Sequence, residues 1–273
     1  MATTAASTPP APAAAGRHVG AATQLGRVMA AEWTKLRSVR STVWTMAMTL
    51  VLSIGLPALF ALAVINASPQ GDFEAASFSM SGLFLGQLVI GSLGVLVVTA
   101  EYSSGTIRAS LSAVPQRDRL LVGKALTFVL ALLVVSLVAC FAAFFLTQAI
   151  LNTHALGVSL GDRGSVQVVV GGALYLTVVG LLGLGLGFML RHTAGAISTV
   201  FGLLFVLPIL ASFLPASWQL HVVKYLPAQA GGAIFSTNPS PDTLAPWTGL
   251  ALFFGYALLS VALGAWVLNR RDA

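Results

Sequence analysis

The sequence predicts an all-α polytopic membrane protein, and two observations carry this prediction: long apolar stretches and an uneven placement of positive charge. A helix needs roughly 20 mostly apolar residues to cross the hydrocarbon core of a bilayer, which is about 30 Å thick. Six stretches meet this condition, at residues 43–65, 82–100, 124–150, 167–190, 195–214 and 247–268. Hydrophobic residues make up 57% of the chain and charged residues only 8%, which is far from the composition of a soluble domain. We therefore expect six transmembrane helices.

The Lys and Arg residues predict the orientation of these helices. Twelve of the 14 lie before the first stretch, after the last, or in the second and fourth connections, and only Arg163 and Lys224 lie on the other side. The positive-inside rule then places both termini in the cytoplasm of a multi-pass plasma-membrane protein. Membrane topology explains the net charge of +6, so no nucleic-acid partner is expected.

The ends of the chain differ in composition from the apolar stretches. Residues 1–24 are rich in Ala, Thr and Pro and have no apolar core, so we interpret them as a disordered cytoplasmic tail rather than a signal peptide. Residues 25–273 form a single six-span domain in this interpretation.

The segment 25–43 has the pattern of an amphipathic helix that lies along the cytoplasmic interface. Trp33 would sit at headgroup depth, with Lys35 and Arg37 near lipid phosphates. Glu32 interrupts the apolar side of this helix. Either it finds a cationic partner on the cytoplasmic loops or another protein, or it stays at the headgroup level, hydrated or paired with Lys35. The apolar side comprises Leu25, Val28, Met29, Leu36, Val39 and Val43.

The cytoplasmic loop at residues 101–124 contains a predicted short helix. Gly105 provides a sharp turn, Thr106 caps a helix that begins at Ile107, and Pro115 ends it, since the residue before proline disfavours the α conformation. Arg108 lies at the start of this helix. The prediction is a cytoplasmic helix of one to two turns between two spans.

The motifs of this loop resemble a known family. The pattern Glu-Tyr-x-x-Gly-Thr-Ile-Arg…Pro-x-Arg…Lys, preceded by Ala-Glu-Trp-Thr-Lys-Leu-Arg-Ser from residue 31, is similar to permease subunits of type-2 ABC exporters, especially the actinobacterial branch. The resemblance implies a coupling helix around residues 105–111 that docks into a separate ABC ATPase subunit. It also implies a second permease subunit, identical or related, so a homodimer in the lipid bilayer is expected. The implied coupling residues are Glu101, Gly105, Thr106, Ile107, Arg108, Pro115 and Arg117.

The outward loop at residues 215–246 is long and combines aromatic residues with Pro and Gly. Similar exporters place short helices here that dip back into the outer leaflet, and the composition fits such a re-entrant segment. It fits an ordinary folded loop equally well.

No catalytic, metal or cofactor site is expected. No Gly-x-x-x-x-Gly-Lys-Ser/Thr occurs, and Gly123-Lys124 lacks both the first glycine and the hydroxyl residue, so ATP hydrolysis is assigned to the partner. The stretch 157–161 matches Gly-x-Ser-x-Gly but lies in a short outward loop, where no hydrolase sheet can support it. The four histidines lie on separate segments without metal-ligand spacing.

The sequence therefore favours an export permease, with a non-transport membrane scaffold or sensor subunit as the alternative. Glycines at close-packing intervals, among them Gly91 and Gly94 and then Gly180 and Gly183, predict helices in close contact. For the fourth stretch, a substrate-lining or dimer face is the alternative to packing within the bundle. Few polar residues lie in the spans, which favours a lipophilic or amphipathic cargo. Among them are Gln87, Gln148, Tyr175 and Tyr256.

Overall fold

In the part of the chain that the computed structural model describes, six helical segments are long and apolar enough to cross a membrane, which confirms the predicted fold class. The structure describes residues 21–67, 73–113, 117–215, 218, 221–237 and 243–270. Five of the spans are single helices: α2 (Arg40–Ala67), α4 (Leu83–Ser103), α6 (Arg117–Leu151), α7 (Ser165–Leu190) and α12 (Pro246–Arg270). The fifth span in chain order, between α7 and α12, consists of three consecutive segments. The parts of the fifth span are α8 (Thr193–Phe201), the π-helical turn η2 (Gly202–Val206) and α9 (Leu207–Ala211).

Helix α7 lies at the centre of the bundle and packs against α4, α6 and α12. Of its most apolar 18-residue stretch, 83% is buried. Glycines explain the close approach: a Cβ added to Gly94 would lie 2.2 Å from the carbonyl oxygen of Gly180, and one on Gly183 would lie 2.3 Å from that of Gly91. Small residues let membrane helices bring their backbones into contact, as the sequence predicted.

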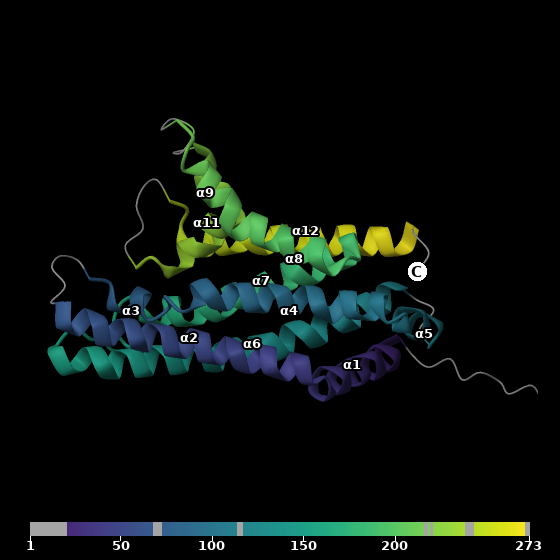
Figure 1. Ribbon diagram of the computed structural model, residues 1–273, viewed down its shortest axis with the longest axis horizontal. Coiled ribbons are helices and arrows are strands. Elements are labelled where there is room, and N and C mark those ends of the chain that lie inside the picture. The colour runs from purple at the N-terminus through teal and green to yellow at the C-terminus, as the bar shows by residue number, and fades with distance from the viewer. Residues whose placement is uncertain are drawn as a thin grey trace, which may run out of the picture.

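The fifth span is attached more loosely, with only 22% of its apolar stretch buried. Figure 1 shows α9 leaning away from the other helices. The change of direction follows η2, which ends just before Pro208. A proline lacks the amide hydrogen for the regular ladder, and a π turn accommodates the interruption. Pro208 thus lies just after this turn.

Two ends of the bundle differ in their short elements (Figure 1). One end, here named the α1 end, carries α1 (Ala21–Ser38) and α5 (Thr106–Ala113). The opposite end carries short helices, of which α11 and η4 pack against α12, and η4 also against α7. These include three segments of the long predicted loop, in agreement with the short helices that the resemblance implied. The short elements are α3 (Ala75–Phe78), η1 (Asn152–His154), η3 (Val223–Tyr225), α11 (Pro227–Gly232) and η4 (Ala233–Phe235).

The amphipathic helix is present with different bounds from those predicted. Helix α1 begins at Ala21, so residues 21–24 are helical rather than part of the predicted tail, whose first 20 residues lie outside the described ones. The helix ends at Ser38 and the chain bends at Val39 before α2. Because of this bend, Val39 and Val43 do not continue the apolar side and are 46% and 50% exposed.

Candidate functional site

Helix α5 is the predicted helix of the loop at residues 101–124, and a glycine turn connects it to α4. Gly105 has a φ of +72°, a conformation that L side chains rarely adopt, although the space around its Cα is open. The helix begins at Thr106, one residue before the predicted start, and the Thr106 hydroxyl lies 2.9 Å from that of Ser104. Gly105 thus occupies the position before the helix that the sequence assigned to Thr106. Pro115 lies outside the described residues.

One apolar side chain anchors α5 to the helices behind it. Ile107 is 3% exposed and packs with Val28 of α1 and Leu120 of α6, while Tyr102 of α4 borders this contact. Arg108, the next residue, lies on the exposed side of the same helix. The exposed side chains of this helix that the structure describes are polar (Thr106, Arg108 and Ser112), while Ile107 fixes its inner side to three other helices.

Four charged side chains meet beside this anchor and form what we call the charge cluster: Glu32, Lys35, Glu101 and Lys124. The Lys124 ammonium donates to Glu32 at 2.5 Å and to Glu101 at 2.9 Å. The Lys35 ammonium donates to the same two carboxylates at 2.7 and 2.8 Å. Two acids and two bases from α1, α4 and α6 are thus paired in alternation, and the Lys124 side chain is only 2% exposed.

The charge cluster resolves the alternatives for Glu32. Its side chain is buried rather than hydrated, and it pairs both with Lys35 on its own helix and with Lys124 on α6. Burial by itself would lower the pKa of the Lys35 ammonium, but its hydrogen bonds to Glu101 and Glu32 and their negative charges outweigh this and raise the pKa. The Lys35 ammonium is therefore held in its charged form at neutral pH.

The dipeptide Gly123-Lys124, the nearest match to a phosphate-binding loop, lies inside the continuous helix α6. Its lysine is engaged by two carboxylates, and its glycine lets α1 approach, since a Cβ there would lie 2.5 Å from Val28 Cγ1. The dipeptide is therefore a helix-packing and ion-pairing element of this structure.

Arginines at the α1 end hold the last helix in place. The Arg117 guanidinium donates to the Leu268 carbonyl at 2.7 Å, and that of Arg191 donates to the Val267 carbonyl at 3.2 Å. Arg191 also lies over the Tyr102 ring, 5.1 Å from its centroid. Arg117, predicted as a coupling residue, thus makes an intramolecular contact. The contact of Arg191 was not predicted, and its only sequence signal was a charge between two spans.

A cavity of about 530 Å³ opens next to the charge cluster, between α1, α2, α4, α5 and α6. All four members of the cluster line it, together with Ser110 on α5 and apolar residues of α4. Helices α5 and α1 therefore border one shared space.

The polar groups predicted in the spans are mostly used within the structure. Tyr175 donates to Gln87 at 2.5 Å, and both line a smaller cavity of about 350 Å³ toward the opposite end. Gln148 donates to Ser79 and to the Ala75 carbonyl, each at 2.9 Å. Few of these groups are left to bind a polar cargo.

Comparison with known proteins agrees with this arrangement. Residues 28–209 match the family model of the ABC-2 family transporter protein, which covers about two thirds of the chain, from α1 into α9. Among curated proteins, no significant match was found. The chain therefore belongs to the ABC-2 transporter family, as a membrane permease of an ABC transport system.

Proposed function

We propose that this chain is the permease of an ABC exporter of the actinobacterial type and couples to its ATPase through residues 101–124. The observation that carries this proposal is α5, a short helix on a positive-φ glycine with Arg108 exposed and Ile107 buried. A separate ATPase could bind its outer side, while its inner side transmits force to the bundle.

The contacts behind α5 supply a route for that force. Displacement of Ile107 acts on Val28 of α1 and Leu120 of α6, because these side chains are in contact. The charge cluster joins the same helices to α4 through Glu101 and Lys124. A push on α5 would therefore reach α1, α4 and α6 together.

A second permease subunit, most simply an identical copy, would complete the translocation pathway. The spans α2 and α8–α9 are each only 22% buried along their apolar stretches, so they offer surface to a partner or to lipid. The α1 end carries most of the positive charge, which supports a cytoplasmic position for it and for both termini in the plasma membrane. The apolar spans support a lipophilic or amphipathic cargo.

Assembly with an ATPase tests the coupling. A tagged permease is purified from its native membranes, and mass spectrometry identifies any co-purified subunit that contains a phosphate-binding loop. We expect Arg108→Glu to reduce the recovered ATPase about tenfold, since charge-assisted contacts contribute roughly 1.5–3 kcal/mol. Gly105→Val should act similarly, because a β-branched residue disfavours positive φ.

The matched control is Arg163→Glu, which changes an exposed arginine at the opposite end by the same charge. It should leave ATPase recovery and expression unchanged. Normal recovery and transport in both loop variants would show that the loop is only a connector. If the unmodified permease brings down no ATPase, the scaffold or sensor alternative gains support.

Cysteine labelling in intact cells tests the orientation. In a Cys140→Ala background, Ser112→Cys should resist an impermeant maleimide added outside, while Ser159→Cys at the opposite end should react. Both serines are exposed, so accessibility to water does not separate them. Labelling of residue 112 from outside would reverse the proposed topology.

A further inference from the structure

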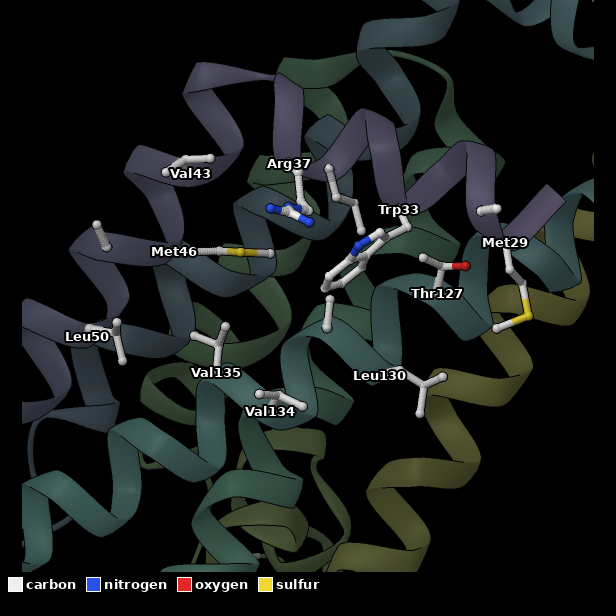
Figure 2. A pocket seen from close by; sticks show the side chains of 14 residues that line it. Met29, Trp33, Arg37, Val43, Met46, Leu50, Thr127, Leu130, Val134 and Val135 are labelled. Carbon is white, nitrogen blue, oxygen red and sulfur yellow. The ribbon is translucent and has the colours of Figure 1, made fainter. Parts of the chain in front are cut away.

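An apolar groove of about 710 Å³ opens where α1 turns away from the spans (Figure 2). Its walls come from three helices: α1 on one side, α2 on the second and α6 on the third. Figure 2 shows the Trp33 ring extending from α1 over the groove, toward the side chains of α6. The labelled lining residues are Met29, Trp33, Arg37, Val43, Met46, Leu50, Thr127, Leu130, Val134 and Val135.

The groove is open to the membrane rather than enclosed by protein. Val43, Leu130 and Val134 line it and are 50%, 52% and 62% exposed. Its one hydroxyl, on Thr127, already donates to the Gly123 carbonyl at 2.8 Å. Water would gain few hydrogen bonds in such a space, whereas a hydrocarbon chain would be matched to its walls.

One positive charge lies at the rim. Arg37 is the single charged side chain among the described lining residues, and it is exposed. No carboxylate in the described part of the chain forms an ion pair with it. Glu32, the acid on the same helix, is already paired with Lys35 and Lys124. The guanidinium therefore remains available to an anion from outside the protein.

The apolar walls match the acyl chain of a lipid, and the guanidinium beside them matches its phosphate. We propose that the groove binds one anionic phospholipid, with an acyl chain between α2 and α6 and the phosphodiester on Arg37. Arginine is suited to phosphate because its planar donors form paired hydrogen bonds. A net negative headgroup is favoured over a zwitterionic one, since the latter brings an ammonium group to a site whose described lining residues include no acid. Trp33 would cover the chain at headgroup depth.

Native mass spectrometry of the purified full-length chain tests the proposal, with phosphatidylglycerol and phosphatidylcholine as probes. We expect one phosphatidylglycerol per chain to be retained in preference to phosphatidylcholine. Arg37→Gln should weaken phosphatidylglycerol binding about tenfold and remove the preference. Arg40→Gln, at an exposed arginine that does not line the groove, should change binding less than twofold.

A second pair of variants tests the apolar walls. Ala47→Phe fills the groove from α2 and should reduce binding of both lipids, while Val51→Phe places the same ring on a 63% exposed position of that helix outside the lining. If the larger ring of Ala47→Phe disturbs folding, Arg37→Gln still tests the proposal, because it changes an exposed side chain without adding volume. Equal binding by Arg37→Gln and Arg40→Gln would overturn the proposal. So would a change from dimer to monomer in Ala47→Phe without lipid loss, because a second copy would then occupy the groove.

Discussion

Helix α7 packs against α4 and helix α1 packs against α6, but different interactions hold these two contacts together. At the α4–α7 contact, Gly180 and Gly183 lie with their backbone against that of Gly94 and Gly91, and no charged side chain takes part. At α1, Val28 and Leu36 bury a narrow apolar stripe, and the charge cluster closes the contact. The two contacts differ because one lies among the membrane spans and the other lies at the end of the bundle, where water is present.

Inside hydrocarbon, apolar side chains gain little by leaving lipid for protein, so association depends on close packing. At the end of the bundle, water competes for charged groups, and exposed ion pairs contribute little. Lys124 escapes this competition because its side chain is only 2% exposed. The α1 contact therefore depends on a buried ion pair, and the α7 contact depends on the absence of side chains.

The largest effect should come from breaking the charge cluster. Lys124→Met leaves the buried Glu32 and the half-buried Glu101 with only Lys35 between them, and loss of one partner from a buried pair costs about 3–5 kcal/mol. Lys35→Met removes a 43% exposed side chain and should cost about 1 kcal/mol or less. Thermal unfolding in detergent measures both. Equal losses would show that burial does not distinguish the two lysines.

A methyl group at the α4–α7 contact should have the next largest effect. Gly94→Ala places a Cβ against the Gly180 backbone, which no rotamer change can relieve, so we expect a loss of about 1–3 kcal/mol. Gly255→Ala on α12 meets nothing within 4 Å and serves as the control. Unfolding temperatures of the two variants compare them. If Gly94→Ala is as stable as the control, the helices are not in backbone contact.

The same substitution at the α1 contact should have the smallest effect. Gly123→Ala meets the side chain of Val28 rather than backbone, and a small shift of α1 can relieve the contact, so we expect a loss of about 1 kcal/mol or less. Gly26→Ala meets nothing within 4 Å and should stabilise α1 by up to about 1 kcal/mol. Protease accessibility of α1, together with unfolding, measures both variants. A larger loss at Gly123 than at Gly94 would reverse the comparison.

Much of the architecture was predictable because it depends on short-range composition. The six predicted apolar stretches are helical in the described part of the chain. Lipid offers no hydrogen-bond partners, so every backbone N–H and C=O group must form its hydrogen bond within its own segment. Gly105 located the start of α5 to within one residue. The glycine spacing predicted close contact, although it did not say which helices would meet.

The sequence by itself therefore determined the number of spans, the amphipathic helix, the short helix after Gly105 and the uneven distribution of charge. Only the tertiary structure decided the partners. Glu32 was recognisable as an acid out of place, yet Lys124 lies 92 residues away, and their meeting depends on how α1 and α6 rotate and cross. The bend at Val39, which opens the groove beside Arg37, was hidden for the same reason. Periodicity describes one helix at a time, whereas ion pairs and cavities arise from the relative placement of several.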